Sequence, residues 1–138
     1  MLIENKILSL PALLRKLPAL RRRSKTIAFT NGCFDLMHIG HVKYLEDASR
    51  GRRVLIVGLN SDRSIRRIKG PGRPILVQKS RAAVLAALES VDFVVIFNED
   101  TPYRTVQCDR HRTSRLYSGR SGSSRQIGTY PTDLSRCG

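Results

Sequence analysis

The sequence predicts an α/β fold: a doubly wound parallel sheet with helices on both faces. Short apolar runs that read as buried strands occur at residues 26–29, 54–59 and 92–97. Segments with the apolar spacing of helices occur between and after them, at residues 42–48, 63–68 and 80–88. Because strands and helices alternate, we expect right-handed crossovers between parallel strands.

The first part of the chain predicts an amphipathic helix over residues 7–22, with leucines on its apolar face. Ser9 is a candidate N-cap, and Pro18 is expected to end or kink the helix near residues 16–17. We therefore divide the chain into three parts. They are a helix and linker (1–25), a core (26–102) and a basic tail (103–138).

Composition narrows the function only partly. The 138 residues suffice for one domain, and the formal net charge of +14 suits anionic ligands or nonspecific nucleic-acid contact. No apolar run is long enough to span a membrane and no secretory pattern is visible, so we expect a cytoplasmic protein without membrane contact. The three cysteines form no Cys-x-x-Cys pair, which argues against a disulfide framework or a zinc knuckle.

The turn after the first expected strand carries the most informative motif, His38-Ile39-Gly40-His41. Histidines three residues apart share one face of a helix, and a helix N-terminus offers unpaired N–H groups to an anion. Gly40 removes a side chain where a phosphate or a base must come close. Two other interpretations remain: histidines that only cap or pack, and a metal site of Asp35, His38 and His41.

Polar residues follow the other expected strands. Asn60 and Asp62 are either helix caps or site residues, because carboxyl ends of parallel strands face the ligand crevice. The loop that begins at Lys69 is either a solvated turn or a phosphate-binding flap, with Lys69 or Arg73 as the cation. Arg81 lies at the start of a helix.

Five blocks in order resemble the HxGH nucleotidyltransferase superfamily, and within it the adenylyltransferases that make ADP-heptose from heptose 1-phosphate. The resemblance covers residues 7–102. The blocks are Thr30-Asn31-Gly32-Cys33-Phe34-Asp35-Leu36, His38-Ile39-Gly40-His41, Gly58-Leu59-Asn60-Ser61-Asp62, Lys69-Gly70-Pro71-Gly72-Arg73-Pro74 and Asp92-Phe93-Val94-Val95-Ile96-Phe97.

The resemblance implies a Rossmann-like fold and the transfer of AMP from ATP to a sugar 1-phosphate, with release of pyrophosphate, in the synthesis of a lipopolysaccharide core precursor. It implies that His38, His41 and Arg81 are catalytic, and that Cys33, Phe34 and Gly40 contact the nucleotide together with the two histidines. Lys69, placed slightly ahead of Arg73, and Asp35, Asn60 and Asp62 would bind the substrate. Lys69 and Arg81 would hold phosphate groups.

Cofactors and partners follow from the same resemblance. Mg²⁺ is expected to arrive with ATP, held by phosphate oxygens and water rather than by protein ligands. A sugar-kinase partner would be a separate chain, a homo-oligomer is left open, and nucleic acid is not expected as the natural partner.

The tail, residues 103–138, departs from the family pattern. It contains arginines but no lysine and shows neither strand nor helix periodicity, so we expect the sheet to be truncated after its third strand. The family's Gly-Gly-Asp-type turn and Ser-Thr-Thr segment are absent, and Ser123-Ser124-Arg125 receives no role. A disordered extension and a frameshift near residues 102–112 are both hypotheses for this tail.

Alternative functions remain open at this point. They are a cytidylyltransferase for glycerol or ethanolamine phosphate, an inactive nucleotide-binding remnant, and a basic nucleic-acid-binding module. Substituting His38 separates them, because it should abolish turnover in an enzyme, weaken ATP binding in a remnant, and leave nucleic-acid binding unchanged.

Overall fold

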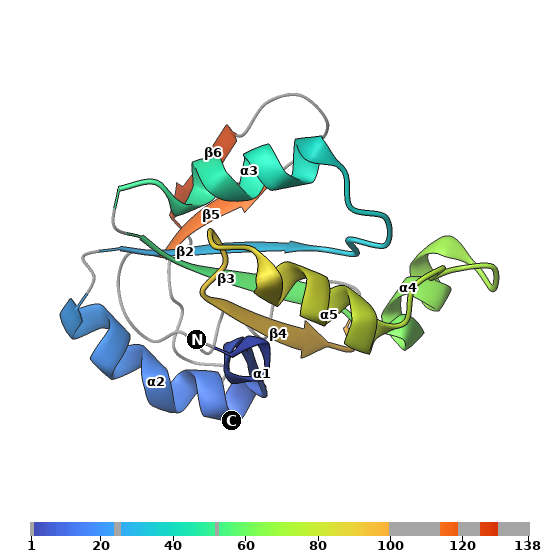
Figure 1. The fold of residues 1–138 in the computed structure, drawn as a ribbon, viewed down its shortest axis with the longest axis horizontal. Coiled ribbons are helices and arrows are strands. Elements are labelled where there is room, and N and C mark those ends of the chain that lie inside the picture. Colours follow the sequence, from blue (N-terminus) through green and yellow to red (C-terminus); the bar gives the residue numbers. More distant parts are fainter. Residues whose placement is uncertain (1, 24–25, 52, 100–113, 119–124, 130–138) are drawn as a thin grey trace.

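A computed structural model describes residues 2–23, 26–51, 53–99, 114–118 and 125–129. Helices and strands alternate from α1 to α4, then α5 follows α4 directly and the remaining described elements are strands (Figure 1). In chain order they are α1 (Ile3–Lys6), β1 (Ile7–Leu8), α2 (Leu10–Arg23), β2 (Thr26–Gly32), α3 (Ile39–Ser49), β3 (Arg53–Asn60), α4 (Asp62–Lys69), α5 (Gln78–Ala87), β4 (Phe93–Phe97), β5 (Ser114–Ser118) and β6 (Arg125–Thr129).

The strands form one sheet in the order β1-β4-β3-β2-β5-β6. Each neighbouring pair from β1 to β5 is parallel, and only β6 runs antiparallel to its neighbour. The central pair is in continuous register from Thr26 opposite Arg53 to Gly32 opposite Leu59. Strands β2, β3 and β4 therefore end at the same edge, where the turns that follow them meet (Figure 1).

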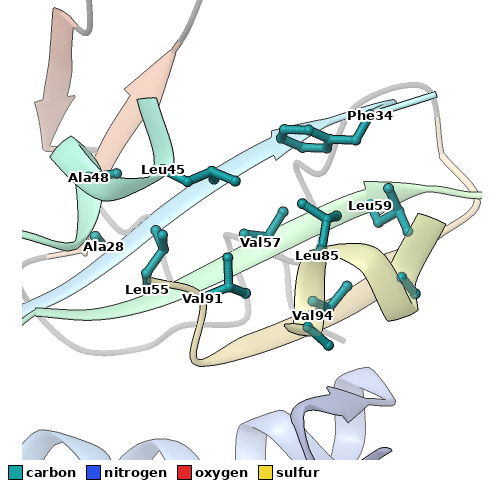
Figure 2. Packing of buried hydrophobic residues seen from close by; sticks show 12 residues of the cluster. Ala28, Phe34, Leu45, Ala48, Leu55, Val57, Leu59, Leu85, Val91 and Val94 are labelled. Carbon is teal, nitrogen blue, oxygen red and sulfur yellow. The ribbon is translucent and has the colours of Figure 1, made fainter. Parts of the chain in front are cut away.

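Two hydrophobic clusters cover the two faces of this sheet. On one face, α3 and α5 bring Leu45 and Leu85 against Leu55 and Val57 (Figure 2). On the other face, α2 packs Leu13 and Leu17 against alternate residues of the same strands, Ile27, Phe29, Ile56, Phe93 and Val95. Neighbouring strand residues point to opposite faces, which explains why the apolar runs are continuous rather than alternating. The predicted doubly wound α/β class is confirmed.

The N-terminal segment differs from the prediction of one helix over residues 7–22. The chain forms α1 first, then Ile7–Leu8 pairs with Val94 and Val95 of β4 as a short edge strand, and α2 follows. Ser9 accepts a hydrogen bond from the N–H of Ala12 at 3.3 Å, as a cap should. The helix does not end before Pro18, because α2 continues to Arg23 while Leu17 is buried on the sheet.

The expectation that the sheet stops after its third strand is wrong. Backbone of β5 pairs with β2 from Ile27 opposite Ser114 to Thr30 opposite Tyr117, so this strand covers the edge that was expected to be unpaired. Residues 102–112, where a frameshift was hypothesised, lie outside the described residues, as do residues 123–124. The division into three segments and the frameshift stay predictions.

Candidate active site

The candidate site lies where the parallel strands end. Strand β2 leads through a turn at residues 33–38 into α3, and β3 leads through Ser61 into α4. The loop between α4 and α5 lies beside this edge, at the right of Figure 1. Carboxyl ends of parallel strands are the usual ligand-binding edge of an open α/β sheet.

The turn after β2 is built tightly around Phe34. This residue has a φ of 45°, a conformation that non-glycine residues rarely adopt, and its ring is buried. A Cβ on Gly32 would lie 2.9 Å from Cε2 of that ring, so glycine is required there. The Phe34 ring contacts the His41 ring edge-on, with a centroid separation of 5.4 Å. The turn therefore packs against His41, one of the two motif histidines, through the Phe34 ring.

Both histidines cap the N-terminus of α3. Nδ1 of His38 accepts the N–H of Gly40 at 3.0 Å, and Nδ1 of His41 accepts the N–H of His38 at 3.3 Å. The two rings stack with centroids 3.9 Å apart. This reciprocal arrangement is a capping box made of two imidazoles. The capping interpretation is thus correct for Nδ1, and it leaves the other ring nitrogen of each histidine for a ligand.

The capping bonds determine where each proton sits. An imidazole that accepts at Nδ1 carries its proton on Nε2 when neutral, so both rings can donate from Nε2. Partial burial, followed by the neighbouring His38, lowers the pKa of His41 below its ordinary value of 6.5. His41 is therefore neutral near pH 7 and is a hydrogen-bond donor rather than a cation.

A side chain at position 40 would displace the His38 ring from its present position. A Cβ at this position would lie 2.8 Å from Cε1 and 2.9 Å from Nδ1 of His38. The room left by the missing side chain of Gly40, which we expected a phosphate or base to use, is therefore bordered by the His38 ring. His38, Ile39 and Gly40 are all exposed, so the same surface remains open to a ligand.

Arg81 is buried, with its side chain at 0% exposure. Its guanidinium donates from Nε to the carbonyl of Leu76 at 2.9 Å, and from one terminal nitrogen to the carbonyls of Cys33 and Asn60 at 2.7 and 2.8 Å. The other terminal nitrogen pairs with Asp62 Oδ1 at 2.8 Å. The expectation that Arg81 holds a phosphate directly does not fit this geometry, because its donors point at protein acceptors inside the fold.

Asp35 faces the loop rather than open solvent. Its two carboxylate oxygens each accept the N–H of Ile75 at 2.9 Å, and Oδ1 also accepts the N–H of Leu76 at 2.9 Å. Burial acts to raise the pKa of Asp35. The two backbone hydrogen bonds and the charges of Arg73 and Arg81 outweigh it, and the pKa lies below its ordinary value. Asp35 is therefore an ionised anchor for the loop.

Asn60 and Asp62 also turn inward. The side-chain amide of Asn60 donates to Ser64 Oγ at 2.9 Å, and Asp62 pairs with Arg81. Neither residue caps α4, because Ser61 performs that role by accepting the N–H of Ser64 at 3.1 Å. Their expected contact with a substrate is replaced, in this structure, by contacts that fix the start of α4.

The remaining candidates lie around this network. Lys69 is exposed at the end of α4, and Arg73 Nη1 lies 3.5 Å from Asp35 Oδ2 with its side chain 37% exposed. Cys33 has a free thiol, half-buried, and its carbonyl is bound by Arg81. The structure thus brings Asp35, Arg73 and Arg81 together, while Lys69 stands apart as an exposed cation.

Sequence reasoning missed several contributors. The backbone N–H groups of Ile75 and Leu76 have no sequence signature as anchors, and neither does the Gln78 side chain, which accepts the N–H of Asp62 at 2.9 Å. Tyr44 bonds to buried Thr30, at an oxygen–oxygen distance of 2.5 Å, and so joins α3 to β2. The signal for the Tyr44 contact was a tyrosine in the second turn of the helix that follows the histidine motif.

The described residues bear on two further features, a metal site and a membrane-spanning helix. No group of three or more His, Cys, Asp and Glu side chains there is arranged to hold a metal ion, and both oxygens of Asp35 are occupied by backbone donors. No helix in the described part of the chain is long and apolar enough to cross a membrane.

Comparisons with known proteins show the family of the chain. The sequence model of the cytidylyltransferase-like family matches residues 29–120 of the 138. The bifunctional protein HldE of Syntrophotalea carbinolica is 59% identical over 86 residues, which are 62% of this chain and 18% of that protein. The bifunctional protein HldE of Campylobacter fetus is 54% identical over 104 residues, which are 75% of this chain and 22% of that protein.

The chain therefore spans about a fifth of the length of these curated relatives. Among solved structures, a lipopolysaccharide core biosynthesis protein from Thermoplasma volcanium aligns with a TM-score of 0.52 and 31% identity. That alignment covers 59% of this chain and 65% of the other chain. With the family match, the parallel sheet and the histidine cap in agreement, the chain belongs to the cytidylyltransferase-like family of nucleotidyltransferases.

Proposed function

We propose that this chain transfers AMP from ATP to a sugar 1-phosphate, heptose 1-phosphate in particular, with release of pyrophosphate. The observation that carries the proposal is the histidine cap, in which two imidazoles accept backbone N–H groups at Nδ1 and leave their Nε2 atoms for a ligand. The adenylyl acceptor is supported by the HldE relatives and by the lipopolysaccharide core biosynthesis protein of similar fold. The product would then be ADP-heptose, a precursor of the lipopolysaccharide core.

The proposed reaction is an in-line displacement. An oxygen of the acceptor phosphate forms a bond to the α-phosphorus of ATP, the bond from that phosphorus to the oxygen bridging to the β-phosphate breaks, and pyrophosphate leaves. Negative charge grows on the β-phosphate as this bond breaks. The Nε2–H groups of His38 and His41 and the N-terminus of α3 donate to the phosphate oxygens, where positioned donors are most effective.

The chain needs no covalent intermediate for this reaction. Mg²⁺ bound with ATP would supply further charge neutralisation through phosphate oxygens and water. Lys69 is exposed at the end of α4 and Arg73 lies beside Asp35, and we assign these two cations to the acceptor phosphate. Backbone groups of Cys33, Phe34 and Gly40 would contact the nucleotide.

The test is a pyrophosphate-release assay with two nucleotides and three acceptors. Mg-ATP and Mg-CTP are each combined with heptose 1-phosphate, glycerol 3-phosphate or ethanolamine phosphate, and His38→Ala is measured beside the wild type. We expect release only with ATP and heptose 1-phosphate, and a loss of about 10²- to 10³-fold in kcat for the variant. Turnover with CTP alone would replace the proposal by the cytidylyltransferase alternative. No turnover, with ATP binding weakened in His38→Ala, would identify an inactive remnant.

The basic composition leaves nucleic-acid binding as an alternative function that a salt titration tests. If the function were nucleic-acid binding, affinity for RNA or DNA would fall steeply with salt and would not respond to His38→Ala. A cytoplasmic location, a sugar-kinase partner and a homo-oligomer remain proposals that accompany this one.

A further inference from the structure

Two segments far apart in the sequence are joined at the site edge. The turn at residues 33–35 follows β2, and the loop at residues 73–77 precedes α5. Asp35 holds the loop from one side through the N–H groups of Ile75 and Leu76, each at 2.9 Å. Arg81 holds it from the other side through the carbonyl of Leu76, also at 2.9 Å.

Leu76 is therefore bound at both of its backbone polar groups by charged side chains. Arg81 also donates to the carbonyl of Cys33 at 2.7 Å, so the same guanidinium is hydrogen-bonded to both the turn and the loop. Arg81 is 1% exposed and Asp35 is 5% exposed, so water competes little for these hydrogen bonds. We call Asp35, Arg81 and the backbone groups of Cys33, Ile75 and Leu76 the latch.

Apolar burial does not explain how the loop is held. The side chains of Ile75, Leu76 and Val77 are 59%, 37% and 60% exposed, so the loop contributes little to either hydrophobic cluster. A loop with exposed apolar side chains gains little free energy from packing. Its position must then depend mainly on the charge-assisted hydrogen bonds of the latch.

The latch also connects the loop to the histidines. Asp35 directly follows Phe34, whose ring contacts the His41 ring. On the loop side, Arg73 lies 3.5 Å from Asp35, and Lys69 ends the helix from which the loop departs. One contiguous set of contacts therefore fixes the loop with its cations relative to the histidine cap.

We infer that Asp35 and Arg81 are positioning residues that hold the loop at residues 73–77 in place before any substrate binds. In this arrangement the acceptor-phosphate side of the site is preformed, and the loop is not a lid that closes on the ligand. The inference rests on the proposed function for its catalytic consequence, but not for its structural content.

The test uses Asp35→Asn, which keeps the side-chain size, and Arg81→Lys, which keeps the positive charge; each removes part of the latch. The matched controls are Asp47→Asn and Arg50→Lys, which alter an ion pair of the same residue types at the C-terminal end of α3. That pair has an N–O distance of 3.0 Å and side chains 38% and 79% exposed. Asp35→Asn also provides an answer if Arg81→Lys does not fold.

Amide hydrogen exchange at Ile75 and Leu76, followed by NMR without substrate, measures the latch directly. We expect both amides to be protected in the wild type and to exchange about tenfold to hundredfold faster in the two latch variants. The control variants should change these rates by less than about twofold. Unchanged protection in Asp35→Asn would overturn the inference.

Kinetics then separate positioning from a general loss of folded protein. We expect KM for the acceptor to rise about tenfold in Asp35→Asn, while the Kd of Mg-ATP stays within about twofold of the wild type. A purely structural role would lower the active fraction and leave both constants unchanged, which would contradict the inference. If the wild type releases no pyrophosphate, the proposed function fails, and the exchange rates alone still decide the latch.

Discussion

Gly40→Ala is a small change with a large expected effect on activity. In the structure, the new Cβ would lie 2.8 Å from Cε1 of His38, closer than carbon atoms approach without displacement. The His38 ring is the end of an exposed, flexible side chain, so it can rotate away and relieve the overlap. The substitution therefore moves one of the two proposed catalytic donors from its position without disturbing the core.

The expected stability change is small because two effects oppose each other. Loss of the His38 capping bond costs about 0.5–2 kcal/mol. Alanine in place of glycine inside a helix returns up to about 1 kcal/mol. The net change in the free energy of unfolding should lie within about 1 kcal/mol. By contrast, misplacing one positioned donor should lower kcat by about 10²- to 10³-fold.

Pyrophosphate release from Mg-ATP and the acceptor, together with urea denaturation, measures both quantities. Gly72→Ala is the matched control, because no atom lies within 4 Å of the Cβ that it would add. We expect this control to retain near wild-type turnover. If Gly40→Ala retained wild-type kcat, the His38 ring would not need its present position and the reasoning about the histidine cap would be refuted.

Three further predictions concern stability. Arg81→Met should lower the free energy of unfolding, measured by urea titration, by about 3–5 kcal/mol, because buried acceptors lose their charged partner. The control Arg63→Met, at an exposed position, should change it by less than about 0.5 kcal/mol. Leu45→Ala, at a side chain with 0% exposure, should cost about 2–5 kcal/mol, and exposed Val84→Ala is its control. Because the folded pKa of His41 is lowered, the folded state resists protonation, so stability should fall as pH drops below 6.5. In His41→Gln the urea midpoint should lose less over that range, and an equal loss would contradict the assignment.

The sequence predicted the central layers of the fold because their signals are strong. Continuous apolar runs in β3 and β4 could only be buried strands between helices, and the α3 helix began where the histidine motif placed it. The first strand escaped notice because two residues, Ile7 and Leu8, are too short to show a period. Strand β5 escaped notice because Ser114–Ser118 is not an apolar run and pairs through its backbone.

The sequence predicted the position of the two histidines at the start of α3 but not the contacts of the charged residues. Spacing alone brought His38 and His41 onto one face, which the capping geometry bears out. Arg81 was assigned to the reacting phosphates because it matches an arginine of the resembling family. Its acceptors in the structure are the Asp62 carboxylate and the carbonyls at positions 33, 60 and 76, which no sequence pattern reveals. The inward direction of Asp35 depends in the same way on two backbone N–H groups 40 and 41 residues further along.

The measurement that tests the account most directly is ¹⁵N NMR of the imidazole side chains of His38 and His41, with and without Mg-ATP. The account predicts that near pH 7.5 both rings carry their proton on Nε2, because each Nδ1 accepts a backbone N–H. It further predicts that Mg-ATP shifts both Nε2 resonances in the wild type and fails to shift that of His38 in Gly40→Ala. Protons on Nδ1, or Nε2 resonances that do not respond to Mg-ATP, would contradict the claim that these two side chains donate to the nucleotide.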